Sequence, residues 1–214
     1  MSWLSGHSSG VLRWLISGVV VVLLGVAALI FWNVRTAAAD TALGAALDVY
    51  NAPLAVPGAP AEAGVYTAAS DRAKEANRQF VAIAGNFGLF PAGSKAHYFA
   101  GVTYEELGQT GSAESELKTA AGSMDRNVAN LAKLALAGLY HQTARDSQAI
   151  EIYNALAAKP SDTVSAAVAQ LDLADLYAAN GKQDQARAIW AKVKDSDKEG
   201  AAGSIAAQKL AAKQ

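Results

Sequence analysis

Residues 101–117 read GVTYEELGQTGSAESEL, and the same pattern returns at residues 137–153 (AGLYHQTARDSQAIEIY) and 174–190 (ADLYAANGKQDQARAIW). Each segment has a small residue three positions before a tyrosine, an alanine nine positions after that tyrosine, and a bulky apolar residue four positions later. The tyrosines are Tyr104, Tyr140 and Tyr177, at intervals of 36 and 37 residues. A period in the mid-thirties is typical of stacked helical hairpins, so the sequence predicts an all-α solenoid.

The repeated small residues predict close packing of the two helices within each hairpin. They are Gly101, Ala137 and Ala174. A single hairpin cannot bury its own apolar face, so the predicted units gain their stability by stacking on one another. The alternative is an irregular helical bundle.

The turns inside the hairpins also repeat. Gly108 and Gly181 stand where the C-terminus of a helix favours a left-handed residue. The second unit has Ala144 at this position, so we expect its turn chemistry to be less regular than that of the other two units.

The N-terminal region carries a long uncharged segment. Trp14 to Trp32 spans 19 residues without a charge, between Arg13 and Arg35. As a helix it would extend about 28 Å, close to the hydrocarbon thickness of a bilayer. Tryptophans at both ends suit the membrane interface. We therefore expect a short tail at residues 1–13 and an uncleaved transmembrane signal-anchor helix at residues 14–34. The alternative is a signal peptide cleaved after the alanines at 37–39.

Charge and composition narrow the possible locations and partners. Arg13 and the absence of acidic residues before the span favour a cytoplasmic N-terminus and a repeat domain on the opposite side of the membrane. The chain has no cysteine, which fits a bacterial envelope protein and excludes a lipidated one. The net charge is −1 and no basic stripe is present, which argues against nucleic-acid binding.

The rest of the chain divides at composition changes. Residues 35–64 predict a juxtamembrane helix at 36–51, which either continues the membrane span or begins just beyond it, and a Pro/Gly/Ala-rich loop. Residues 65–197 predict the repeat domain, with a helix at 66–84 and three repeats at about 92–124, 127–160 and 162–197. The helices near Tyr50 and Phe80 predict a first repeat with a loop inserted between them, giving three to four hairpins in all. Residues 198–214 predict a C-terminal capping helix.

Residues 92–197 resemble the tetratricopeptide repeat, because small residues stand at the predicted helix crossings and aromatic residues at the wedges between hairpins. A single anchor followed by such repeats is similar to the ancillary subunit of the bacterial Sec translocon. That resemblance implies an inner-membrane protein in contact with translocon subunits and periplasmic chaperones. The segment FPAGSKA at residues 90–96 is also similar to repeat starts in the cell-division coordinator and outer-membrane assembly families.

No catalytic constellation is evident in the sequence, so we expect neither an enzyme nor a cofactor. The histidines His7, His97 and His141 stand far apart and form no metal-binding motif, so no metal site is expected. Glu105 and Glu106 are adjacent on a predicted helix and point about 100° apart. A solvated helix face explains them better than a catalytic pair. Small-molecule substrates are not expected either.

The tetratricopeptide resemblance implies which residues of each first helix face inward. A concave partner-binding groove would then be formed by Lys95, Tyr98, Val102, Glu105, Leu131, Leu134, Gly138, His141, Val168, Leu171, Asp175 and Ala178. Within it, Tyr98, Leu134 and Leu171 would form an apolar stripe suited to an apolar peptide or a partner helix. The alternative is that the two leucines pack in the core or against the C-terminal helix. Some family members hold a C-terminal carboxylate with several cations, but here Lys95 alone is available, so no such clamp is expected.

Together these features predict a membrane-anchored, non-enzymatic scaffold that binds proteins at the bacterial envelope. The resemblance implies an accessory role in protein translocation or periplasmic chaperoning, with translocon subunits, chaperones or client polypeptides as partners. Two alternatives remain open at this point. One is a cleaved, soluble periplasmic adaptor in cell division or envelope assembly. The other is a structural subunit of a larger membrane complex.

Overall fold

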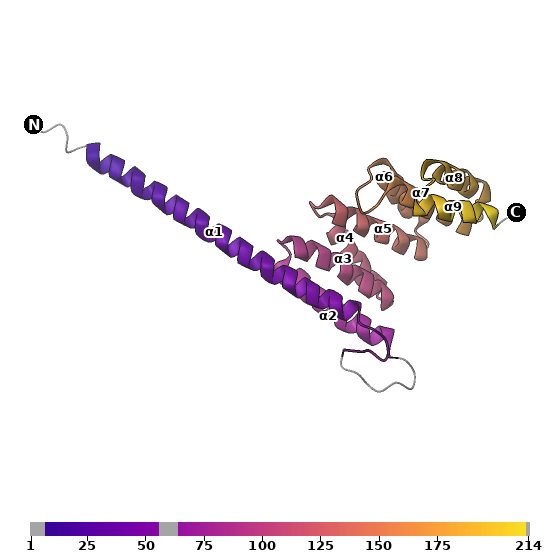
Figure 1. Cartoon of the computed structure of the whole chain (residues 1–214), viewed down its shortest axis with the longest axis horizontal. Helices are drawn as coiled ribbons and strands as arrows, with labels where there is room; N and C mark the ends of the chain where they lie inside the picture. Colours follow the sequence, from indigo (N-terminus) through magenta and orange to yellow (C-terminus); the bar gives the residue numbers. More distant parts are fainter. Residues whose placement is uncertain (1–6, 56–63, 213–214) are drawn as a thin grey trace, which may run out of the picture.

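The structure, a computed structural model, describes residues 7–55 and 64–212, with side chains from residue 13 onward. In this part of the chain it is all-α and contains nine helices (Figure 1). Helix α1 (His7–Tyr50) is long and apolar, and its N-terminal half projects beyond the other helices. The remaining helices stack in pairs, which confirms the predicted all-α solenoid.

The later helices match the predicted repeats in order. They are α2 (Ala69–Phe87), α3 (Pro91–Glu106), α4 (Thr110–Ala121), α5 (Arg126–Gln142), α6 (Asp146–Ala158), α7 (Ala166–Ala179), α8 (Gln183–Ser196) and α9 (Ala201–Ala211). The three repeats with the tyrosine pattern are the pairs α3/α4, α5/α6 and α7/α8. Helix α9 packs on α8 and α7 at the C-terminal end of the stack (Figure 1).

The turns within the three repeats share one hydrogen-bonding pattern. The backbone amides of Gln109, Arg145 and Lys182 donate to the carbonyls of the three repeat tyrosines, at 2.8, 2.7 and 2.9 Å. Gly108, Ala144 and Gly181 all have positive φ angles, of 70°, 57° and 74°. This is a Schellman motif, in which a left-handed residue allows the last helical carbonyls to accept hydrogen bonds from the amides that follow. The expectation of a less regular turn at Ala144 is therefore wrong: the alanine adopts the glycine conformation despite its Cβ.

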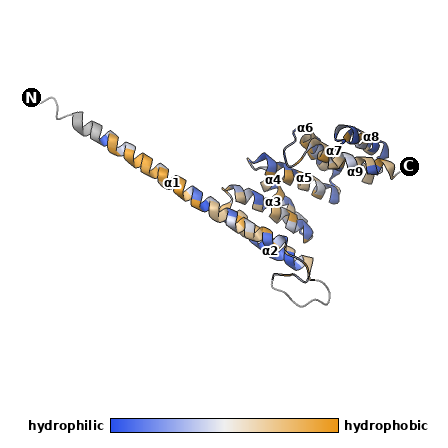
Figure 2. Ribbon diagram, viewed as in Figure 1, coloured by the Kyte–Doolittle hydropathy of each residue, from blue (hydrophilic) through white to orange (hydrophobic). Residues whose placement is uncertain are grey.

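Helix α1 has two different environments along its length. From Trp14 to Val34 its large apolar side chains are exposed, and Figure 2 shows this half as the most hydrophobic part of the chain. From Ala39 onward, one face of α1 is buried against α2 and α3. The juxtamembrane helix predicted at residues 36–51 continues the membrane span as part of α1, which was one of the two possibilities left open for it. The expected tail at 1–13 lies outside the described residues up to residue 6, and α1 already begins at His7.

The loop between α1 and α2 is tied together at its base. Ala55 donates to the carbonyl of Tyr66 at 2.8 Å, and the Tyr66 amide donates to the carbonyl of Pro53 at 3.1 Å. The middle of the predicted Pro/Gly/Ala loop, residues 56–63, lies outside the described residues. Because its ends are held together, the loop can be inserted between α1 and α2 while these two helices still pack as a hairpin.

The core runs through the stack as a chain of apolar clusters. In the first cluster, Phe80 of α2 stacks on Phe99 of α3 at 5.1 Å between ring centroids. The amide of buried Asn77 donates to the hydroxyl of buried Thr103 at 2.9 Å, which satisfies both polar groups in that core. The second cluster contains buried residues from α4, α5, α6 and α7, and the third contains buried residues from α7, α8 and α9. Each hairpin therefore buries its apolar face against its neighbour, as expected for a solenoid.

Candidate functional site

The residues predicted to face inward lie on three helices, α3, α5 and α7. Of these, α3 and α5 pack directly against each other, and Gln142 near the end of α5 donates to the Glu105 carboxylate of α3 at 2.7 Å. The first two repeats are therefore held in a defined relation. A surface shared by α3 and α5 is preformed rather than assembled on binding.

A hollow of about 310 Å³ opens between these two helices. We call it the α3–α5 hollow. It is lined by Lys95, Tyr98, Phe99, Asp125, Asn127, Val128, Leu131 and Thr163. Three of the predicted groove residues (Lys95, Tyr98 and Leu131) thus meet at one place. The walls are aromatic and aliphatic, while one cation and one carboxylate lie among the lining residues, so the hollow combines apolar surface with a few polar groups, as ligand pockets do.

The start of α5 is positioned by its own cap and by the loop between α6 and α7. The Asp125 carboxylate accepts from the backbone amides of Asn127 and Val128, at 2.9 and 3.4 Å, and so caps the helix. The hydroxyl of Thr163 donates to the carbonyl of Asn127 at 2.9 Å. The amide of buried Asn130 donates to the carbonyl of Lys159 at 3.2 Å. These contacts hold the loop beside the hollow.

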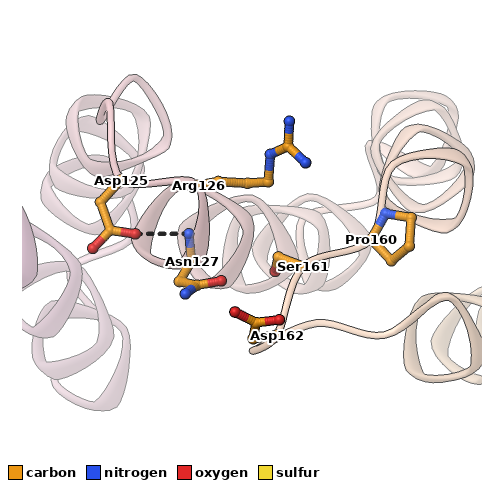
Figure 3. A pocket seen from close by; sticks show the side chains of 6 residues that line it. All are labelled: Asp125, Arg126, Asn127, Pro160, Ser161 and Asp162. Carbon is orange, nitrogen blue, oxygen red and sulfur yellow. Dashed lines mark hydrogen bonds between the residues drawn. The ribbon is translucent and has the colours of Figure 1, made fainter.

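A second, more polar hollow of about 430 Å³ adjoins the first. Figure 3 shows Asp125 and Asn127 at the start of α5, opposite Pro160, Ser161 and Asp162 of the α6–α7 loop. Asp125 and Asn127 line both hollows. A bound segment leaving the apolar hollow would therefore meet backbone and side-chain hydrogen-bonding groups next to it.

Burial extends the pH range over which Tyr98 stays neutral. Burial raises the pKa of its hydroxyl above the usual value, and the charge of Glu105 raises the pKa further. Tyr98 is therefore neutral at physiological pH. It presents an aromatic wall and a hydroxyl that can donate a hydrogen bond to a partner.

The predicted apolar stripe of Tyr98, Leu134 and Leu171 is interrupted in the structure. Tyr98 lines the α3–α5 hollow, but Leu134 is half-buried between two core clusters. Leu171 is only 8% exposed and belongs to a cluster with Ala202 and Ala206 of α9. Leu171 therefore packs under the C-terminal helix, which was the alternative considered for this leucine. Val168, half-buried, belongs to the same cluster.

Two further predicted groove residues, His141 and Asp175, have polar partners inside the chain. His141 Nδ1 lies 2.7 Å from Asp146 Oδ1, and this contact holds the pKa of Asp146 below its usual range. Asp175 accepts from the indole of Trp190 at 3.1 Å and forms a salt bridge with Lys209 of α9. Val102 is half-buried on α3. The contacts of Asp175 fasten α7 to α8 and α9, and Asp175 and Ala178 also line a smaller hollow of about 200 Å³ beside Trp190 and Lys209.

The sequence did not predict several of the residues that line the α3–α5 hollow. Thr163 reaches the hollow only because the α6–α7 loop folds back onto α5, and no local pattern signals that contact. Asp125 could have been found, because an aspartate directly before a helical segment is a typical N-cap. In the described part of the chain, no three His, Cys, Asp or Glu side chains gather in a way that could hold a metal ion.

Comparison with known proteins agrees with this architecture. A family model described as a tetratricopeptide repeat-like domain matches residues 11–213. The match includes the long apolar helix as well as the repeats, so it spans nearly the whole chain. No curated protein matches the sequence.

Proposed function

The chain belongs to the tetratricopeptide repeat-like domain family, and on that premise we propose that it is a membrane-anchored, non-enzymatic scaffold that binds proteins at the bacterial envelope. The α3–α5 hollow carries this proposal, because it is an apolar, preformed surface shared by two adjacent repeats. Stacked hairpins characteristically bind partners on such surfaces. The expected ligand is an extended or helical protein segment that places an apolar side chain against Tyr98 and Leu131.

Helix α1 supports the anchor. Its exposed stretch is long and apolar enough to cross a membrane by length and composition. A cleaved adaptor would require processing after Ala39, which lies inside the continuous helix α1 and is fully buried against α2 and α3. Cleavage there would also remove the contacts of Trp32 and Arg35 with the α2–α3 region. These features favour the uncleaved anchor. The positive charge of Arg13 before the span favours an N-terminus in the cytoplasm and repeats in the periplasm.

The resemblance to the translocon's ancillary subunit suggests the partners. The scaffold would hold translocon subunits, a periplasmic chaperone or a translocating client close to the membrane. Tethering converts a weak contact into an effectively intramolecular one, because both partners are confined to the same small volume. The role is therefore positional, and it requires no catalytic group.

Site-specific photocrosslinking in the native membrane tests the proposal. A photoreactive amino acid would replace Lys95, which is exposed and lines the hollow, or Ser115, which is exposed on α4 of the same repeat. We expect translocon subunits or periplasmic chaperones to crosslink at position 95 and not at 115. Equal labelling at both positions would exclude the hollow as the binding surface.

A gentle-detergent purification of the full chain, followed by mass spectrometry, complements this test. Bait that keeps residues 1–39 supports the anchor, whereas bait beginning at Asp40 would establish the soluble adaptor. Recovery at fixed stoichiometry within a large membrane complex would instead favour the structural-subunit alternative.

A further inference from the structure

The turn between α2 and α3 is fastened to α1 at one level of that helix. The Trp32 and Phe90 rings lie 4.6 Å apart between centroids. The Arg35 guanidinium donates to the carbonyl of Asn86 at 3.1 Å and lies 4.6 Å from the centroid of the Phe87 ring. This α2–α3 turn, residues 88–90, therefore has a fixed height along α1.

That height coincides with the end of the uncharged stretch. No charged residue occurs between Arg13 and Arg35, and a bilayer core of about 30 Å takes up about 20 helical residues. Trp32 then falls at the boundary between hydrocarbon and headgroups, where tryptophan is enriched in membrane proteins. Since α1 is one uninterrupted helix through residues 32–35, whatever packs against Trp32 lies at the same depth.

The tip of the turn presents an apolar side chain that is almost fully exposed among the described residues. Leu89 is 88% exposed, although the residues on either side of it along the turn approach α1 and α2. Outside α1, the other large apolar side chains exposed in the described residues are Leu54, Met124 and Ile205. Among these four, Leu89 is the one whose neighbouring residue contacts α1 at the predicted membrane boundary.

We propose that the α2–α3 turn is a second membrane contact, with Leu89 inserted in the interfacial layer of the bilayer that α1 crosses. This inference rests on the proposed anchoring of α1. Trp32 then lies at the membrane interface, where tryptophan is enriched, and Phe90 packs against it while Phe87 packs against Arg35 at the same depth. The occupant of this surface is the lipid headgroup region, because the turn continues the apolar surface of the anchor.

The contact would determine how the repeats stand on the membrane. A single helix allows the attached domain to rotate and tilt, whereas two contacts with the bilayer restrict both motions. Helix α3 begins at Pro91, directly after the turn, and Lys95 follows within about 6 Å along the helix axis. The α3–α5 hollow would therefore be held close to the membrane surface, where it could reach segments that emerge from a membrane partner.

The absence of cysteine from the chain permits a clean depth measurement. Single cysteines would replace Leu89, Leu23 in the middle of the uncharged stretch, and Met124, an exposed apolar residue in the α4–α5 connection. Each full-length variant is labelled with an environment-sensitive fluorophore. It is then reconstituted in phosphatidylethanolamine/phosphatidylglycerol vesicles that carry a quencher either near the headgroups or deep in the acyl chains.

We expect the deep quencher to act at position 23, the shallow quencher to act at position 89 with a blue-shifted emission, and neither to act at 124. Labels at 89 and 124 that behave alike, with 23 quenched, would overturn the membrane contact and leave the anchor intact. A label at 23 that remains unquenched would overturn the anchor, and the contact with it. Position 124 controls for any attraction of the fluorophore itself to lipid.

Discussion

A methyl group added to Gly101 would lie 2.6 Å from the Cγ atom of Leu117, because α3 and α4 cross closest at this glycine. Leu117 is fully buried, so its side chain cannot move aside into solvent. The equivalent positions of the other repeats, Ala137 and Ala174, are also fully buried. The first repeat thus requires a residue without a Cβ where its two helices cross, whereas the other two repeats accommodate alanine.

Replacement of Gly101 by alanine is therefore expected to lower the free energy of unfolding by about 1–3 kcal/mol, the usual cost of overpacking a core. Gly138→Ala is the matched control, because a Cβ at Gly138 meets nothing within 4 Å. That variant should gain up to about 1 kcal/mol from its better helix propensity. Thermal unfolding of the full chain in mild detergent, followed by circular dichroism, compares the two. Similar shifts in both variants would show that the helix crossing does not limit the packing.

Ala144→Gly should stabilise the protein by about 1 kcal/mol, because alanine at a φ of 57° bears a steric cost that glycine avoids. Ala155→Gly, at an exposed position within α6, should lose about 1 kcal/mol instead, since its backbone is helical. Thermal unfolding, measured as above, should therefore show that the same Ala→Gly replacement raises stability at position 144 and lowers it at position 155. A loss of stability in both variants would contradict the strain at Ala144.

Asp172 should make stability depend on pH. Burial raises the pKa of its carboxyl to about 6, with a further contribution from the charge of Asp175 and a smaller opposing one from Lys209. The usual value in an unfolded chain is about 3.9. The folded state thus binds this proton more tightly, so the stabilisation is fully present below about pH 4 and is lost as the pH rises through about 6.

The variant Asp172→Asn removes this titration. Because the side chain is partly exposed, we discount the effect for solvent screening and expect a gain of about 1 kcal/mol at pH 7.5. Near pH 4 the variant and the wild type should unfold alike. The measurement is the difference in unfolding midpoint between the variant and the wild type at each pH from 4 to 8. Contributions from other carboxylates are common to both proteins and cancel in this difference. A difference that does not change with pH would contradict the assignment.

Substitutions at Leu171 and Lys95 should distinguish a core residue from a residue of the binding surface. Leu171→Ala should cost about 2–4 kcal/mol, because it leaves a cavity beneath α9. Lys95→Glu should leave the free energy of unfolding within about 0.5 kcal/mol, since this side chain is exposed, yet it should weaken partner capture. Unfolding and crosslinked yield are measured on both variants. Capture that is unaffected by Lys95→Glu would remove that residue from the proposed binding surface.

Much of the candidate site could not be predicted from one sequence. The helical period placed Tyr98, Leu134 and Leu171 at corresponding positions of three helices. Whether such a position stays open depends on what covers it, and a capping helix covers Leu171 while the first two repeats leave Tyr98 beside a hollow. Coverage arises from contacts between residues far apart in the chain, which local patterns do not encode.

The helical repeats, the close crossings, the left-handed turns at Gly108 and Gly181 and the long apolar N-terminal helix could all be predicted from the sequence, whereas the equally regular turn at Ala144 could not. These features depend on residues within one or two helical turns of each other, where backbone geometry and side-chain size act directly. Only contacts between distant parts of the chain bring Thr163 of the α6–α7 loop to the α3–α5 hollow and the α2–α3 turn to Trp32. Each of these is a long-range packing outcome, selected by the burial of apolar surface across the whole stack.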